Sequence, residues 1–189
     1  QVIGNSDFYN GAFPSEYSNA LSGIFDMQIR NGNNQKYEHT FQLGILGIDL
    51  ASEGPISRKH GSSYIFNYRF STTSLATGND MNLKYQDLSF KLNFPTRKAG
   101  TFSIWGIGLI DRYKPEAIDR DEWETQGDRQ SGNTAFDKAA GGLTHKYLIN
   151  ADTYIRSSLA ATYSKDRTRA DQMTEDDKLV HVGDIRNSK

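Results

Sequence analysis

Hydrophobic and polar residues alternate along much of the chain from Tyr37 onward. In the segment 64–70 every even-numbered residue is aromatic, and in 88–94 every even-numbered residue is apolar and every odd-numbered residue polar. Successive side chains of a β-strand point to opposite faces, so each segment is predicted to be a strand with one apolar and one polar face. The predicted apolar set is Tyr64, Phe66, Tyr68, Phe70, Leu88, Phe90, Leu92 and Phe94.

Other segments have a similar pattern. Strands are predicted at Phe102–Ile110, at Tyr154–Tyr163 and within Ala139–Asn150. The segment Tyr37–Ile56 is either one long strand or two strands joined tightly near Gly44–Gly47. No segment favours a helix. The predicted fold class is therefore all-β, an antiparallel meander of about 6–8 strands.

The connections between these segments alternate in length. The segments 57–62, 95–100 and 150–153 are short turns, whereas 72–86 and 111–137 are long polar stretches. Outer-membrane β-barrels have short turns on one side of the membrane and long loops on the other, while long irregular loops are uncommon in compact soluble domains. Bacterial barrels usually close with at least eight strands. We therefore expect a partial segment of a transmembrane β-barrel.

Composition excludes several classes of protein. The 189 residues include 22 basic and 23 acidic side chains, and a formal net charge of −1 favours neither nucleic acid nor anionic lipid as a partner. Cysteine is absent, which excludes disulfides and thiolate metal sites. No apolar run approaches the ~18 residues of a membrane-spanning helix. The first residues lack a signal-peptide pattern, so we expect a removed leader or an excerpt of a longer chain.

The segment Asp7–Asn33 resembles the end of the plug domain of TonB-dependent outer-membrane receptors, most closely those of the Bacteroidetes type. Within it, Tyr17–Gly23 is similar to the family's Tyr-Gly/Ser-Asn-Ala-hydrophobic-Ser-Gly element, and Ile24–Gly32 to the last plug strand and its turn. The segments 50–69 and 88–106 look like the family's next barrel hairpins. The resemblance covers roughly residues 7–163, and a complete member of the family is much larger, with about 22 strands.

The resemblance implies two parts, with the end of the plug and the link to the barrel at 1–34 and the first barrel strands with long extracellular loops at 35–189. It implies nutrient uptake across the Gram-negative outer membrane, energised by the TonB complex, with outer-membrane lipid as a partner and a surface lipoprotein as a further candidate partner. The transported nutrient is not identified, and no TonB box is visible in this sequence. We expect an isolated fragment to oligomerise through its strand edges.

Candidate site residues follow from the strand pattern and from the resemblance. The polar positions of the two clearest strands would face the barrel lumen and the plug, and Arg69 and Lys91 are candidates for ion pairs with plug carboxylates, although a simply hydrated polar face is the alternative. The candidates for ligand contact are the aromatic residues Tyr113 and Trp123 in the loop 111–137, with packing inside the loop as the alternative. The residues assigned to the lumen are Asn67, Arg69, Lys91 and Asn93.

Enzyme and metal chemistry find no support in the sequence. The acidic residues between Asp119 and Asp128 lack the glycine of an EF-hand loop, and the four histidines lack metal-binding spacing. No nucleophile elbow or nucleotide fingerprint is present. We therefore expect no enzyme, no cofactor and no metal. The alternative to a transporter is a soluble β-sandwich that binds a carbohydrate or another nutrient, with its apolar faces meeting in a dry core.

Overall fold

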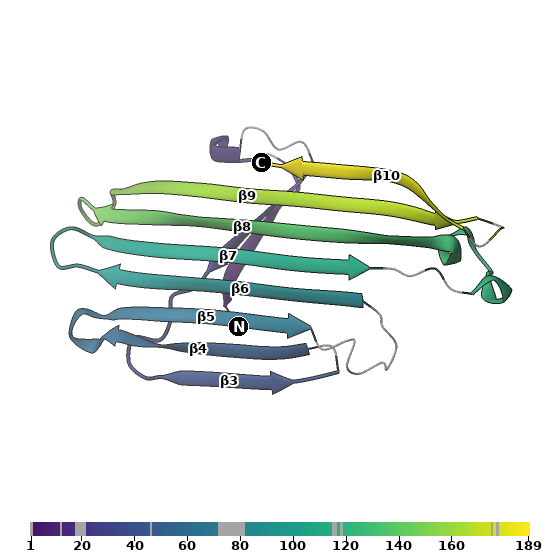
Figure 1. Cartoon of the computed structure of the whole chain (residues 1–189). Helices are drawn as coiled ribbons and strands as arrows, with labels where there is room; N and C mark the ends of the chain where they lie inside the picture. The colour runs from purple at the N-terminus through teal and green to yellow at the C-terminus, as the bar shows by residue number, and fades with distance from the viewer. Residues whose placement is uncertain are drawn as a thin grey trace.

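The computed structural model describes residues 2–11, 13–17, 22–45, 47–71, 82–114, 117, 119–174, 176 and 178–189. Most described residues belong to one antiparallel sheet of eight strands, in which every strand pairs with its neighbours in sequence (Figure 1). The strands are β3 (Glu38–Leu43), β4 (Gly47–Ser57), β5 (Ser62–Ser71), β6 (Asn82–Pro95), β7 (Thr101–Lys114), β8 (Gln130–Leu148), β9 (Tyr154–Met173) and β10 (Leu179–Ser188).

A second, smaller sheet pairs β1 (Ile3–Tyr9) with β2 (Ile24–Ile29). The small sheet ends at Ile29 and the large sheet begins at Glu38. Residue 34, where the sequence divides the chain into two expected parts, lies in the link between them. The remaining elements are single 3-10 turns, namely η1 (Ser15–Tyr17), η2 (Arg58–His60), η3 (Arg120–Glu122) and η4 (Gln126–Arg129). The expectation of an all-β, antiparallel meander is confirmed, and the eight strands reach the upper end of the expected number.

The segment Tyr37–Ile56 forms two strands, because backbone hydrogen bonds between Gly44 and Gly47 close a tight turn. The prediction of one loop over 111–137 is wrong at both ends, where β7 continues to Lys114 and β8 begins at Gln130. These ends are polar, yet Arg112 on β7 forms an ion pair with Asp137 on β8. Cross-strand charge pairing of this kind stabilises strands that hydrophobic patterning does not reveal. Residues 72–81 of the other expected long loop lie outside the described residues.

Strand register divides the sheet into two faces that differ in chemistry. The apolar face contains the even-numbered aromatic and aliphatic residues of β5 and β6, as the alternation predicts. One row across this face consists of Tyr64, Leu92, Ile104, Leu143 and Leu159, each opposite the next on the neighbouring strand. The opposite face, called here the polar face, contains Asn67, Arg69, Lys91 and Asn93, together with some apolar residues such as Trp105.

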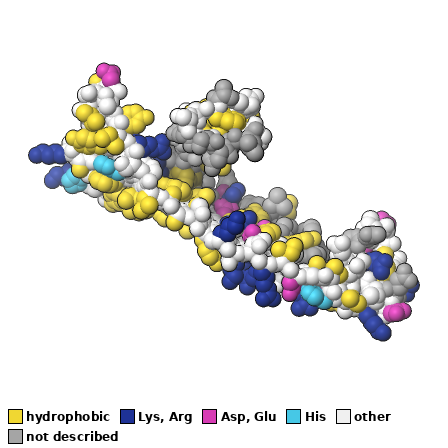
Figure 2. Space-filling view, turned by 90° about the horizontal axis from the view of Figure 1, so that it is seen from above, with side chains coloured by type: hydrophobic (Ala, Val, Ile, Leu, Met, Phe, Trp, Pro, Cys, Tyr) yellow, Lys and Arg dark blue, Asp and Glu magenta, His cyan; other side chains and the backbone are white. Residues whose placement is uncertain are grey.

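The large sheet is a thin single layer with hydrophobic side chains along one side (Figure 2). Leu159 on the apolar face is 75% exposed and Leu143 is 43% exposed. Among the described residues, the only buried hydrophobic residues are Val2, Ile65 and Ala135. A contiguous apolar surface of this extent marks a face that meets another apolar phase or partner.

The connections β4–β5, β6–β7 and β8–β9 are all short and lie at one end of the sheet, called here the short end, at the left in Figure 1. The other end has the two long connections, β5–β6 and β7–β8, together with the brief turns β3–β4 and β9–β10. At the short end, η2 closes the turn between β4 and β5. Gly61 ends this turn with φ of 70°, a left-handed conformation that glycine adopts without strain. The open edges of the sheet are β3 and β10, and the described strands do not close into a barrel.

Candidate functional site

The N-terminal segment lies against the polar face of the large sheet. In Figure 1 the β1–β2 hairpin crosses behind β6, β7 and β8. Lys91 on β6 donates a hydrogen bond from Nζ to the backbone carbonyl of Ile29, at the end of β2, over 2.7 Å. The N-terminal segment therefore contacts the large sheet from the side of its polar face.

A second anchor joins the segment after β2 to β4. Arg30 binds the Glu53 carboxylate with both guanidinium nitrogens, one of them over 2.7 Å. The backbone N–H of Asn33 donates to Glu53 Oε2 over 2.8 Å. The side-chain hydrogen bond to Glu53 raises the pKa of the Arg30 guanidinium above its usual value, so Arg30 stays charged. A bidentate pair of this kind fixes orientation as well as position.

Between these anchors the chain makes a close approach at Gly32. A Cβ atom on Gly32 would lie 1.9 Å from the carbonyl oxygen of Tyr64 on β5, which is closer than any non-bonded contact permits. Only glycine allows the two backbones to pass at this distance. Residues of the polar face near this crossing are buried, with Ser63 1%, Ile65 3% and Asn93 8% exposed.

The structure places the four residues assigned to the lumen on one face, and each has a different partner. Asn67 donates to Asp49 on β4. Arg69 forms an ion pair with Asp87 on β6 at 2.9 Å. Asn93 accepts a hydrogen bond from the Ser103 hydroxyl on β7 at 3.0 Å.

Within the described part of the chain, Lys91 is the one of these four residues that hydrogen-bonds the N-terminal segment. Its partner is a backbone carbonyl, whereas the sequence suggested either a plug carboxylate or a simply hydrated polar face. The carboxylate that does bind the N-terminal segment belongs to Glu53, which the pattern analysis did not single out. Glu53 sits at a polar position inside an expected strand and follows the same alternation, so the pattern contained the signal.

The two aromatic residues expected to contact a ligand lie in different settings. Tyr113 belongs to β7 and is 47% exposed, so it is a strand residue and not a loop residue. Trp123 follows η3 directly, and the Arg129 guanidinium lies 4.9 Å from the centre of its ring. This cation–π contact orders the indole within the connection between β7 and β8. Ligand contact by Tyr113 and Trp123 stays a prediction.

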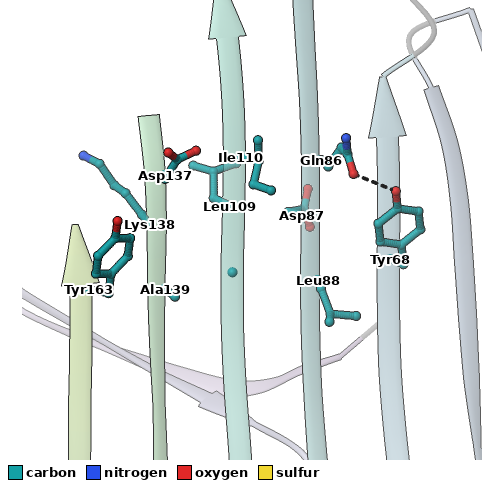
Figure 3. Close-up of a pocket in the computed structure, with 11 residues that line it drawn as sticks. Tyr68, Gln86, Asp87, Leu88, Leu109, Ile110, Asp137, Lys138, Ala139 and Tyr163 are labelled. Atoms are coloured by element: carbon teal, nitrogen blue, oxygen red, sulfur yellow. Dashed lines mark hydrogen bonds between the residues drawn. The ribbon is translucent and has the colours of Figure 1, made fainter. Parts of the chain in front are cut away.

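The apolar face has a shallow hollow of about 350 Å³ near its middle (Figure 3). Small residues, Gly108 on β7 and Ala139 on β8, form its floor. Tyr68 and Tyr163 stand at its two sides, and the Tyr68 hydroxyl donates to Gln86 Oε1 at 3.0 Å. The hollow is open and lies on the far side of the sheet from the N-terminal segment.

No protein-family model, curated protein or solved structure matches this chain. The site is therefore interpreted from its own geometry. No group of metal-ligating side chains occurs among the described residues. In the same part of the chain, none of the helices is long and apolar enough to cross a membrane.

Proposed function

We propose that this chain belongs to an outer-membrane TonB-dependent receptor for nutrient uptake and comprises the end of its plug and the first strands of its barrel. One observation carries the proposal. The chain's own N-terminal segment is anchored to the polar face by Arg30 and Lys91, while the opposite face exposes aromatic and aliphatic side chains from several consecutive strands. In a plugged barrel, the plug lies on the inner face and lipid on the outer face.

The dimensions of the apolar face support a membrane-spanning role. On β7 the apolar run Phe102–Ile110 contains nine residues, and a tilted transmembrane strand needs about 9–11. The three connections at the short end are all brief, and both long connections, β5–β6 and β7–β8, lie at the other end, as at the periplasmic and extracellular ends of outer-membrane barrels. Further strands would have to pair with β3 and β10 to complete a barrel, because lipid does not satisfy open strand edges.

A soluble β-sandwich would need a second sheet over the apolar face. The only second sheet in the described part of the chain, β1–β2, lies on the other face. The transporter therefore accounts for the position of both sheets.

In the proposed mechanism, three parts of the protein have different roles. The connections at the long end, including the residues around Tyr113 and Trp123, capture the nutrient. The strands hold the protein in the outer membrane. The N-terminal segment transmits the movement that the TonB complex drives, and a surface lipoprotein is a candidate partner at the extracellular side. The chain carries out no enzymatic step in this scheme.

The orientation of the two faces can be tested by site-directed labelling, because the chain contains no cysteine. Phe66→Cys on the apolar face and Asn67→Cys on the polar face are matched neighbours on β5. Each variant is expressed separately, labelled with an environment-sensitive fluorophore and reconstituted into vesicles. Lipids with spin-labelled acyl chains should quench the label at position 66 and leave the label at position 67 bright. Equal quenching at both positions, or none at either, would refute the proposal.

The transport step needs a separate measurement. Deletion of the gene should abolish growth on one nutrient at limiting concentration. Uptake of that nutrient in the parent strain should stop when an uncoupler collapses the proton gradient. Uptake that continues in uncoupled cells would exclude energy-coupled import.

A further inference from the structure

A row of basic residues crosses the apolar side of the sheet near its long-connection end. Register places Lys84 on β6 opposite Arg112 on β7, Arg112 opposite Ala135 on β8, Ala135 opposite Arg167 on β9, and Arg167 opposite Arg186 on β10. Four of the five positions in this row, called here the basic row, are therefore cationic. Figure 2 shows Lys and Arg side chains on the same side of the layer as the hydrophobic band, next to it.

Within the described part of the chain, carboxylates neutralise the charges of the basic row only in part. Arg112 and Arg167 share one carboxylate, Asp137, and Arg186 lies 3.7 Å from Asp184. The described strand residues on this face around the row include seven basic and three acidic residues. The basic residues are Lys84, Arg112, Lys114, Lys165, Arg167, Arg169 and Arg186, and the acidic residues are Asp137, Asp171 and Asp184.

The row also places like charges directly opposite each other. Lys84 faces Arg112, and Arg167 faces Arg186, across neighbouring strands. Directly opposed like charges destabilise a sheet, and a bound anion would remove this cost. The chain as a whole has a net charge of −1, so this local excess of positive charge is invisible in the composition.

The hollow described above lies on the same face, two rows nearer the short turns. Its row consists of Tyr68, Leu88, Gly108, Ala139 and Tyr163. Four residues along a strand separate the two rows, which corresponds to about 14 Å. Tyrosines with an apolar ring and a polar hydroxyl are typical of the boundary between membrane and water. The order along the strands is therefore apolar band, tyrosine-flanked hollow, basic row.

We propose that this surface binds a phosphorylated lipid of the outer leaflet, with its phosphate on the basic row and an acyl chain along the hollow. Arginine recognises phosphate through two parallel hydrogen bonds, and the row lies at the end that the proposed function places outside the cell. The hollow presents carbon surface at its floor, with Gly108 and Ala139 leaving room for a chain. This inference rests on the proposed function, because it requires lipid against the apolar face.

The experiment compares two double variants of equal charge change. Arg167→Gln with Arg186→Gln removes charge from the basic row, and Asp137 keeps Arg112 as its partner. Arg97→Gln with Lys98→Gln removes the same charge from an exposed turn at the opposite end of the sheet. Native mass spectrometry in neutral detergent measures the binding of phosphatidic acid, of diacylglycerol, which lacks the phosphate, and of inorganic phosphate.

Phosphatidic acid should bind the unmodified protein in preference to both diacylglycerol and inorganic phosphate. Each basic side chain near an anionic headgroup contributes roughly fivefold in affinity, so the row variant should lose on the order of tenfold or more, and the turn variant should be unchanged. Equal losses in the two variants, or equal binding of diacylglycerol, would overturn the proposal. Tight binding of inorganic phosphate alone would show an anion site without a lipid and would also overturn it.

Two further measurements separate failure of this inference from other failures. If the row variant does not fold, the salt dependence of phosphatidic acid binding to the unmodified protein tests the proposal instead. The affinity of a cationic site for phosphate should fall as the salt concentration rises. The labelling experiment at positions 66 and 67 tests the membrane orientation independently. Quenching at 66 without charge-dependent lipid binding would leave the proposed function standing and exclude the lipid site. A change of oligomeric state in the row variant, without loss of lipid binding, would assign the row to contacts between copies.

Discussion

The two faces of the large sheet are made by alternate residues of the same strands, and their surroundings are very different. The polar face is covered near its short end by the N-terminal segment, which Glu53 and Lys91 hold by hydrogen bonds. No described segment covers the apolar face in this way, and Leu159 on this face is 75% exposed. A one-residue step along a strand thus changes the surroundings of a side chain. Substitutions at neighbouring positions should therefore differ sharply in effect.

The largest difference is expected for a charge placed in the middle of the apolar face. Leu92→Lys should destabilise the membrane-inserted protein by about 2–4 kcal/mol, because the ammonium group would have to enter lipid. Ser89→Lys, on the polar face of the same strand, should cost much less. Urea titration of protein refolded into vesicles measures both. Similar costs at the two positions would mean that the apolar face does not contact lipid.

The close approach at Gly32 tests how the polar face is covered. Gly32→Ala should displace the segment from β5, because the new methyl carbon would overlap the Tyr64 carbonyl oxygen. The expected cost is about 1–3 kcal/mol, which is the usual range for overpacking. Hydrogen exchange of the amides in 24–36 should become faster, while exchange in β8 and β9 should stay the same. Unchanged exchange in 24–36 would contradict the close approach.

The ion pair between Arg30 and Glu53 should have a smaller and more local effect. Arg30→Ala removes two hydrogen bonds to a carboxylate that is 13% exposed, whereas the Arg30 side chain itself is 36% exposed. We expect local opening of the N-terminal segment to become easier by about 1–2 kcal/mol. Lys36→Gln is the matched control, because it breaks an exposed pair with Glu38 and should change little. Limited proteolysis of the N-terminal segment distinguishes the two variants.

The smallest effect concerns Asp128, in the connection between β7 and β8. Backbone N–H groups of Thr125 and Glu124 and the Thr125 hydroxyl bind its carboxylate and hold the pKa of Asp128 below its usual value. A carboxyl whose pKa is lowered in the folded state stabilises it above its unfolded pKa and loses that contribution as the pH falls through its folded pKa.

Acidification below about pH 4 should therefore loosen this connection without changing either face of the sheet. Fluorescence of Trp123 in a Trp105→Phe background should report this change. Asp128→Asn should abolish the pH dependence. A pH response that persists in Asp128→Asn would assign it to another group.

Much of the sheet could be predicted from the sequence because its signal is local. The aromatic positions of β5 and β6 are identified by alternation alone, and the register of the structure places them on one face as expected. The outer parts of β7, β8 and β9 could not be predicted in this way. These parts contain charged residues in place of apolar ones, and the charges pair with residues that are distant in sequence, as Arg112 does with Asp137. The ion pair between Arg30 and Glu53 and the basic row likewise depend on how distant segments align. A short stretch of sequence carries no information on that alignment.

The longest strands, β8 and β9, have 19 and 20 residues and remain paired from Gln130 to Leu148. Between the basic row at Ala135 and the start of β8 at Gln130 this pair continues for about 17 Å. The connection that contains Trp123 therefore leads directly into a long, continuously paired two-stranded segment. Both ends of this connection continue directly into paired strands. Under the proposed function, capture of a nutrient by such a pre-ordered connection would lose less conformational entropy than capture by a flexible loop, and discrimination between nutrients would depend on shape.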